Sequence, residues 1–323
     1  MTDALNRRRF LKHAAIGCAG VATVATGALL ISDKGRDEPP SSGNLLHQVR
    51  NFAVDKPAGP PKLIISHGDA YRATEGAIEA LGGMGRFVHP GETVVIKPNI
   101  GWDRTPLQGA NTNPLVIQAL IKMCLAAGAS NVVVTDNSCN DPARCFTRSG
   151  IWKIAEAAGA EVILPAPHRF RIMDVGGVIL GKMPVLLPAV SATRFINVPV
   201  AKHHGLSGFT GAMKNLYGVL GGRRNRLHQR IDDSIADLAG FIRPTLTVMD
   251  ATRVMLRNGP QGGNLADTKV MNQVIASTDQ VAIDAYSCSL IGLSPADLPF
   301  LSLAEKRGIG TANLSGVTRV EVG

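Results

Sequence analysis

Short apolar runs, many of them β-branched, alternate along the chain with longer segments in which apolar residues recur every three or four positions. The runs are KLIISHG, ETVVIKPN, NVVVTDN and EVILP, and helical segments follow at about residues 73–84, 114–127 and 149–158. Strands that are apolar throughout and separated by helices are typical of a parallel sheet covered on both faces. The pattern therefore predicts an α/β fold with a doubly wound, mostly parallel sheet and helices on both faces.

The second half of the chain departs from this alternation. The segment VGGVILGKMPVLLPA has the pattern of an antiparallel hairpin, so we expect either a mixed sheet or a second small α/β lobe, with sublobes at 61–166 and 167–323. After RFINVPVAKHH the pattern predicts helices at about 210–218 and 231–241, strands TLTVMDA and QVIAS, two further helices and a closing strand VTRVEVG. No G-x-G-x-x-G follows the first strand, which argues against a nucleotide cofactor.

Residues 1–32 have the pattern of an export signal, with a basic start and an apolar stretch at residues 14–31. The run Arg7-Arg8-Arg9-Phe10-Leu11-Lys12 resembles the twin-arginine signal, which reads R-R-x-F-L-K. This resemblance implies export in the folded state by the Tat machinery and a periplasmic location. Two alternatives stay open: the apolar stretch is long enough to remain as an inner-membrane anchor, and AIGC, ending at Cys18, weakly resembles a lipoprotein box. We interpret residues 33–60 as a polar linker and residues 61–323 as the folded domain.

The composition of the chain indicates which classes of ligand to expect. The chain carries a net charge of +9, but only 4% of its residues are aromatic. Proteins that bind single-stranded nucleic acid stack bases on aromatic side chains, so we expect small anions as ligands and no nucleic acid. Five cysteines in 323 residues do not make a disulfide scaffold, because a chain of this length can bury its own core.

Polar residues follow three of the predicted strands directly. They are Lys97-Pro98-Asn99, Asp136-Asn137-Ser138 and Lys202-His203-His204. In open α/β sheets, ligands bind beyond the carboxyl ends of the strands. We therefore expect the chemistry of this protein at these three strand ends.

The segment 202–230 is electrostatically one-sided, with six Lys or Arg, three His and no acid. Glycines recur every third residue ahead of a predicted helix that Thr210 can cap, and a helix N-terminus of this kind can receive an anion. A solvated basic surface loop is the alternative interpretation. On the first interpretation the anion-binding residues are Lys97, Asn99, Lys202, Thr210, Gly211 and Asn215.

Four residues are the candidates for proton transfer: His203, Lys214, His228 and Asp250. Asp250 ends a predicted strand, and with His203 or His228 it could form a general acid/base pair or bind a divalent metal. Asp279, by contrast, is expected to have a structural role as the N-cap of a helix.

Several longer motifs resemble a known family, the domain of unknown function 362. They are VVIKPNIGW at 94–102, TDNS at 135–138, FTGAMKNLYGVL at 209–220 followed by His228, VMDATRVMLRNGPQGG at 248–263 and STDQVAIDA at 277–285. The family has been associated with iron–sulfur proteins, largely because some members carry an appended ferredoxin-like segment with closely spaced cysteines. This sequence contains no such segment, so the resemblance alone does not imply a cluster.

Cys139 and Cys145, in SCNDPARC, leave three interpretations open. They could form a disulfide in the periplasm, they could ligate an iron–sulfur cluster or another metal, or they could be free thiols, inert or redox-active. A metal centre needs further ligands, for which Asp136, Cys288 or one of His203, His204 and His228 are the candidates.

Two hypotheses follow from the sequence. In the first, the protein holds an iron–sulfur cluster or divalent metal, acts in periplasmic redox or metal-dependent chemistry and serves a membrane redox partner. In the second, it is a cofactor-free enzyme or binding protein for a small phosphate or carboxylate, with Cys139 and Cys145 in a disulfide.

Overall fold

The computed structural model describes residues 49–54 and 59–323. The predicted export signal and most of the predicted linker lie outside the described residues. In the described part of the chain, no helix has the length and apolar character needed to cross a membrane.

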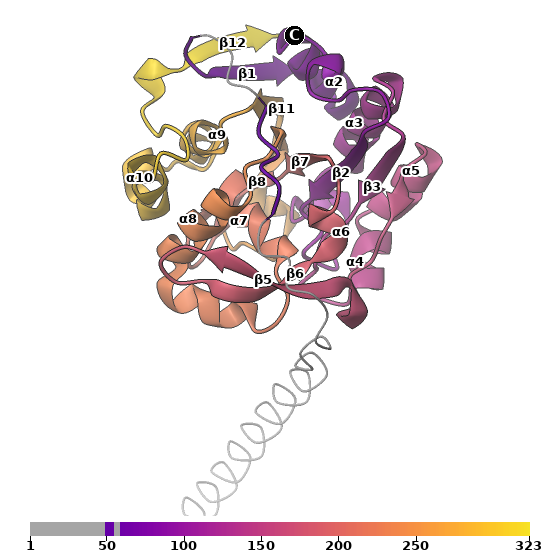
Figure 1. The fold of residues 1–323 in the computed structure, drawn as a ribbon. Coiled ribbons are helices and arrows are strands. Elements are labelled where there is room, and N and C mark those ends of the chain that lie inside the picture. Colours follow the sequence, from indigo (N-terminus) through magenta and orange to yellow (C-terminus); the bar gives the residue numbers. More distant parts are fainter. Residues whose placement is uncertain (1–48, 55–58) are drawn as a thin grey trace, which may run out of the picture. The chain divides into compact units, whose positions relative to one another are not determined.

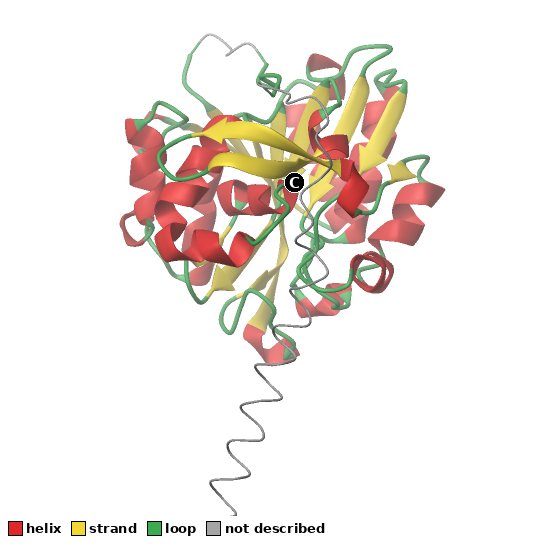
Figure 2. Ribbon diagram, turned by 60° about the horizontal axis from the view of Figure 1, so that its bottom comes forward, coloured by secondary structure: helices red, strands yellow, loops and turns green. Residues whose placement is uncertain are grey.

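A mixed ten-stranded sheet forms the centre of the domain (Figures 1 and 2). Eight strands follow the order β12-β1-β11-β10-β7-β2-β3-β4, while β8 pairs with β10 and with β9. The strands are β1 (Lys62–His67), β2 (Thr93–Pro98), β3 (Asn131–Val134), β4 (Glu161–Val162), β7 (Arg194–Val198), β8 (Val200–His204), β9 (Gly208–Thr210), β10 (Leu246–Met255), β11 (Thr268–Ser277) and β12 (Thr318–Val322).

The run from β10 through β7, β2 and β3 to β4 is parallel, and β11 is antiparallel to both β10 and β1. This confirms the predicted α/β fold in its mixed form. The predicted hairpin is also found, as a separate two-stranded antiparallel sheet of β5 (Phe170–Gly176) and β6 (Gly181–Leu186). Strands from both predicted sublobes share the main sheet, since β2 pairs with β7 and β1 with β11.

Helices cover both faces of the sheet, and Figure 1 shows them on its two sides. They are α2 (Ala70–Ala80), α3 (Pro114–Ala126), α4 (Pro142–Arg148), α5 (Ile151–Ala157), α6 (Leu187–Val190), α7 (Ala212–Asn215), α8 (Ile231–Phe241), α9 (Gln280–Ser287) and α10 (Pro299–Lys306). The helix expected at 149–158 is α5, and the short helix α4 precedes it, separated from it at Gly150, whose backbone is left-handed with a φ of 76°.

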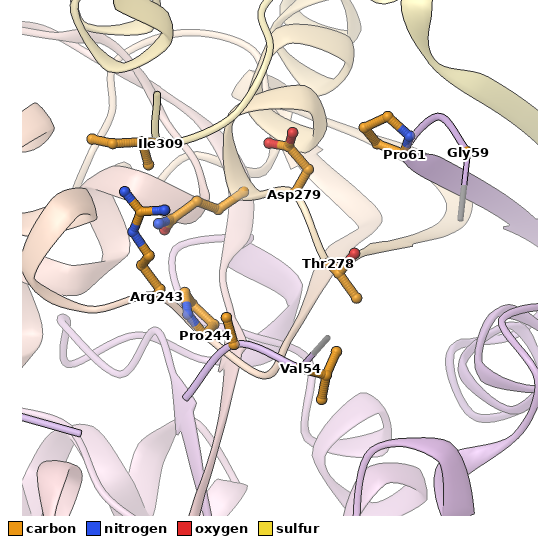
Figure 3. A pocket seen from close by; sticks show the side chains of 10 residues that line it. Val54, Gly59, Pro61, Arg243, Pro244, Thr278, Asp279 and Ile309 are labelled. Atoms are coloured by element: carbon orange, nitrogen blue, oxygen red, sulfur yellow. The ribbon is translucent and has the colours of Figure 1, made fainter. Parts of the chain in front are cut away.

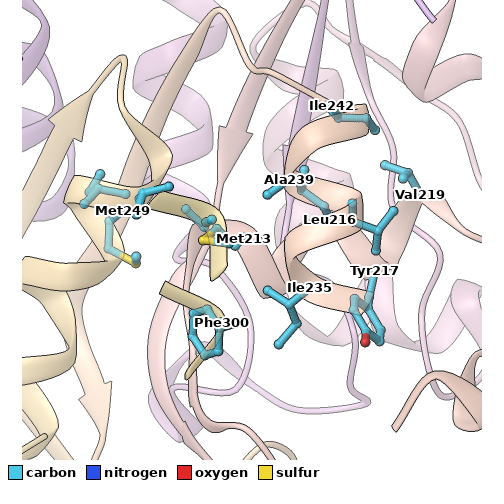
Figure 4. Packing of buried hydrophobic residues seen from close by; sticks show 14 of the residues in the cluster. Met213, Leu216, Tyr217, Val219, Ile235, Ala239, Ile242, Met249 and Phe300 are labelled. Carbon is cyan, nitrogen blue, oxygen red and sulfur yellow. The ribbon is translucent and has the colours of Figure 1, made fainter. Parts of the chain in front are cut away.

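The alternation of side chains along a strand divides the core into two clusters. On β2, Val94 and Ile96 pack in the cluster that contains α2, α3 and α5, whereas Val95 packs in the cluster on the other face. Figure 4 shows part of this second cluster, which includes Leu216 from the turn after α7 and Ile235 from α8. Because both faces are covered, polar residues of the parallel strands gather where the strands end.

Candidate functional site

A buried ion pair joins the carboxyl ends of β2 and β3. The Lys97 amine lies 2.7 Å from Asp136 Oδ1, and both side chains are almost fully buried. Asp136 Oδ2 accepts a hydrogen bond of 2.7 Å from the backbone N–H of Ile100, and its Oδ1 accepts one of 3.0 Å from Asn137. An isolated buried charge is costly, so this pair accounts for the burial of Lys97.

Two asparagines extend this pair into a network. Asn215 Oδ1 accepts hydrogen bonds from Lys97 Nζ at 3.3 Å and from Asn99 Nδ2 at 3.1 Å. Lys202 Nζ in turn donates to Asn99 Oδ1 at 3.1 Å and to the carbonyl of Ala110. The structure therefore brings together four predicted anion-binding residues from three distant segments.

Lys202 and Lys214 are buried without a carboxylate partner among the described residues. The pKa of each amine is lowered to about 7, with burial as the largest cause and neighbouring cations acting in the same direction. Cys139 opposes the shift in both cases, and Asp136 also opposes it for Lys202. The Lys214 amine lies 3.5 Å from the centre of the Tyr217 ring. Within the described chain, this amine forms no hydrogen bond or ion pair.

Arg224 adds a further positive charge beside these lysines. Its guanidinium donates to the carbonyls of Asn137 at 2.8 Å, Ser138 at 2.9 Å and Tyr217 at 3.3 Å. We call the group of Lys97, Asp136, Lys202, Lys214 and Arg224 the lysine cluster. It holds four basic side chains and one carboxylate, so its formal charge is positive.

Two imidazoles stack beside the lysine cluster. The rings of His204 and His228 have centroids 6.1 Å apart at an interplanar angle of 29°, and the Tyr217 ring lies 5.8 Å from His228. Burial and the nearby Lys214 charge lower the pKa of His204 to about 3 and also lower that of His228. Both rings are therefore neutral at physiological pH.

The hydrogen bonds assign opposite tautomers to these two neutral rings. His204 Nδ1 accepts from the backbone N–H groups of Leu206 and Ser207 at 3.1 and 3.2 Å, so its proton is on Nε2. His228 Nδ1 lies 3.2 Å from the carbonyl of Asn225, so it donates there and its Nε2 keeps a lone pair. One ring thus offers a proton and the other accepts one. Sequence reasoning named His204 only as a possible metal ligand.

The hydrogen bonds contradict the predicted pair of Asp250 with a histidine. The buried Asp250 carboxylate accepts from the backbone N–H of Asn113 at 2.7 Å and from both the N–H and the hydroxyl of Thr252. His203 Nδ1 accepts instead from Gly259 at 3.1 Å. Asp250 is therefore bound to the start of α3, because the carboxylate satisfies N–H groups that helix formation leaves free.

The predicted anion site at the N-terminus of α7 is occupied by a carboxylate of the chain itself. Asp284 on α9 accepts hydrogen bonds from the N–H groups of Ala212 and Met213 at 2.5 and 3.0 Å. A Cβ at Gly211 would overlap Asp284 Oδ1, which explains the glycine there. Gly211, not Thr210, stands at the cap position, and Thr210 belongs to β9, so the expectation for these two residues is wrong.

The four cysteines of the described chain are free thiols, so Cys139 and Cys145 do not form the disulfide of the second hypothesis. Cys139 is exposed, and Cys145 is buried, which raises its pKa to about 11. Burial raises the pKa of Cys288 to about 12, and its thiol donates to backbone carbonyls.

These cysteines do not form a ligand set with their surroundings. No group of three or more His, Cys, Asp or Glu side chains in the described chain could hold a metal ion. The described residues thus do not fit the iron–sulfur centre or divalent metal of the first hypothesis. The cysteine-bound metal centre stays a prediction from the sequence.

Two pockets lie away from the lysine cluster. One, of about 270 Å³, is lined by Arg243, Pro244 and Asp279 among others (Figure 3). The other, of about 410 Å³, lies near His168 and Leu187. Neither is lined by a residue for which sequence reasoning predicted chemistry.

A model of one protein family, described as a domain of unknown function (DUF362), matches residues 94–289. The chain belongs to the DUF362 family. The match spans the ends of β2 and β3, all of β8 and α7, and therefore contains every residue of the lysine cluster.

This DUF362 chain is also similar, at low sequence identity, to individual proteins. The thylakoid-associated protein sll1697 of Synechocystis sp. is 25% identical over 240 residues, which cover 72% of this chain and 73% of that protein. A Thermotoga maritima protein of known structure is 12% identical with a TM-score of 0.41, covering 70% of this chain. The lactate racemase apoprotein of Thermoanaerobacterium thermosaccharolyticum is 14% identical with a TM-score of 0.42, covering 78% of this chain. The match spans 60% of each of these two structures.

Proposed function

We propose that this DUF362 protein is an enzyme that binds a small organic anion, a carboxylate or phosphate, at the lysine cluster. One observation carries the proposal: Lys202 and Lys214 are buried together without a carboxylate partner in the described chain. Buried charges in proteins are normally paired, because their desolvation is costly. A bound anion would supply the missing negative charge.

The groups beside the cluster support turnover of the bound anion. His204 presents an Nε2 proton and His228 an Nε2 lone pair, so the site has a donor and an acceptor that stay neutral at pH 7. General acid–base catalysis needs such groups next to the reacting molecule. The proposal includes the compartment: the twin-arginine resemblance of residues 7–12 supports export to the periplasm.

The experiment is a thermal unfolding assay of the full-length chain with a panel of carboxylates and phosphates. We expect at least one anion to raise the melting temperature, because a ligand at 100 times its Kd stabilises a protein by about 2.7 kcal/mol. Lys202→Met removes the buried charge at similar volume and should abolish the rise. Lys269→Met, at an exposed lysine on β11, is the matched control and should keep it.

The proposal fails if no anion in the panel stabilises the protein. It also fails if Lys202→Met responds to anions as strongly as the unmodified chain and the Lys269→Met control do.

A further inference from the structure

Lys214 differs from the other two lysines of the cluster in what its amine contacts. Lys97 Nζ is paired with Asp136 at 2.7 Å, and Lys202 Nζ donates to Asn99 at 3.1 Å. Lys214 Nζ faces the Tyr217 ring, and its residue is only 8% exposed. Its amine is therefore the one of these three for which the described residues supply a ring contact and no ion pair or hydrogen bond.

The surroundings of Lys214 favour a reactive amine. A lysine becomes a nucleophile when an apolar setting or an adjacent cation lets it lose its proton near neutral pH. Burial, Arg224 and Lys202 all act in this direction on Lys214, and its pKa is lowered to about 7. Cys139, which interacts electrostatically with Lys214, is exposed.

We propose that Lys214 is a nucleophile that forms an imine with the carbonyl carbon of a small 2-oxo acid, whose carboxylate is held by Lys202. This inference rests on the proposed function and names the substrate class of the same site. A 2-oxo acid fits because it carries an anionic group for one amine and, on the adjacent carbon, an electrophile for the other.

The step balances without a further reactant. The neutral Lys214 amine attacks the carbonyl carbon, a C–N bond forms, and the π electrons of the carbonyl move to its oxygen. That oxygen takes up a proton while the nitrogen loses one, which gives a carbinolamine. The C–O bond then breaks, water leaves with the second proton from nitrogen, and a C=N bond remains.

The two imidazoles assist these proton transfers. The Nε2 lone pair of His228 accepts the proton from nitrogen and returns it to the carbonyl oxygen, while the Nε2–H of His204 donates a hydrogen bond to that oxygen and keeps its proton. His228 and the Lys214 amine both contact the Tyr217 ring, and the Lys214 charge also acts on the His228 imidazole.

The test is reductive trapping on the full-length chain. The protein is incubated separately with glyoxylate, pyruvate and oxaloacetate, treated with borohydride, digested and analysed by mass spectrometry. We expect a stable secondary amine on the peptide that contains Lys214 with at least one of the three acids. The same three acids are tested in parallel for a rise in melting temperature.

The controls separate this inference from the proposed function. Lys214→Arg keeps the positive charge and should lose the adduct, whereas Lys182→Arg, at an exposed lysine, should keep it. An acid that raises the melting temperature but leaves no adduct on Lys214 overturns the imine and leaves anion binding standing. Adducts only on other lysines overturn it as well. If none of the three acids stabilises or labels the protein, this inference fails, and the wider anion panel decides the proposed function.

Because Lys214→Arg could disturb a packed site, peptide mapping of the unmodified chain is the deciding measurement. It locates the adduct without any substitution.

Discussion

Residue by residue, the lysine cluster shows three ways of burying an amine. Lys97 keeps its charge through Asp136, Lys202 satisfies its donors with neutral oxygens, and Lys214 rests against an aromatic ring. Only the first is a full ion pair. Desolvation is the largest influence on the pKa of all three amines and lowers each of them, and for Lys97 the charge and hydrogen bond of Asp136 oppose it. We therefore expect the pH dependence of anion binding and of stability to come from Lys202 and Lys214.

Anion binding should weaken as pH rises through about 7. The pKa of Lys202 and that of Lys214 are each lowered to about 7 in the free protein, so above this pH an anion must bring protons back to them. Affinity should fall about tenfold per pH unit for each proton taken up. Calorimetric titration between pH 6 and 9 with a carboxylate, which stays ionised over this range, measures the slope. An affinity that does not change with pH would contradict protonated lysines as the ligands.

The lowered pKa values of Lys202 and Lys214 also affect the stability of the ligand-free protein, which should rise with pH while anion affinity falls. Between pH 7 and the ordinary lysine pKa of about 10.4, the unfolded chain binds more protons than the native protein. Lys202 and Lys214 therefore destabilise the ligand-free fold most at or below pH 7. This destabilisation decreases as the pH rises toward about 10.4.

At the scale of elements, the site depends on close contact between the strand ends and the segment after α7. That segment is the 3-10 turn Leu216–Val219, which runs over the Lys97–Asp136 pair. A Cβ on Gly218 would overlap Asp136 Oδ1 and lie 2.7 Å from Lys97 Nζ. The carbonyl of Gly218 also accepts from the N–H of Asn137 at 2.9 Å, which joins the turn to the end of β3. Glycine is required here for space.

Gly218→Ala should therefore lower both stability and anion binding. Forcing a methyl group into a packed region typically costs about 1–3 kcal/mol, and here it would also displace a charged pair. Gly85→Ala is the matched control, because a Cβ there meets nothing within 4 Å, and it should leave both properties nearly unchanged. Urea unfolding and anion titration of both variants provide the measurements. If Gly218→Ala matched Gly85→Ala in both stability and anion affinity, the turn would have room for a methyl group over the Lys97–Asp136 pair, which would contradict this prediction.

The sequence pattern predicted the elements that present the site better than the contacts within it. Apolar runs identified β2, β3 and β8, and strand direction then indicated that Lys97, Asp136 and Lys202 would gather at one edge. The pattern could not indicate that Asp284 fills the start of α7 from 72 residues away, because pairing over that distance depends on tertiary packing.

The hydrogen-bond partner of Asp250 could not be predicted for a similar reason. Asp250 was assigned by its position at a strand end, but its partner Asn113 is 137 residues earlier in the chain. The tautomers of His204 and His228 likewise depend on backbone groups whose placement follows from loop geometry. For Lys214 the local signal was its place in the basic, glycine-rich segment 202–230.

On the scale of the whole molecule, the domain formed by the described residues contains no disulfide. Its two core clusters are built from apolar side chains on both faces of the sheet, and the four cysteines of the described chain are free. Such a domain can complete folding in a reducing compartment, because no step of its folding needs an oxidant. This agrees with the twin-arginine route, which carries proteins that have already folded.

Export should therefore depend on the arginine pair and not on total charge. The double substitution Arg7→Lys and Arg8→Lys keeps the charge of the segment but removes the two residues that the R-R-x-F-L-K pattern specifies. We expect the full-length protein to accumulate folded in the cytoplasm, as measured by cell fractionation and protease resistance. The control is Arg9→Lys, which makes the same exchange at the position that the R-R-x-F-L-K pattern leaves open. It should leave export intact. Periplasmic protein from the double variant would exclude this route, since only a charge-based signal would survive the exchange of arginine for lysine.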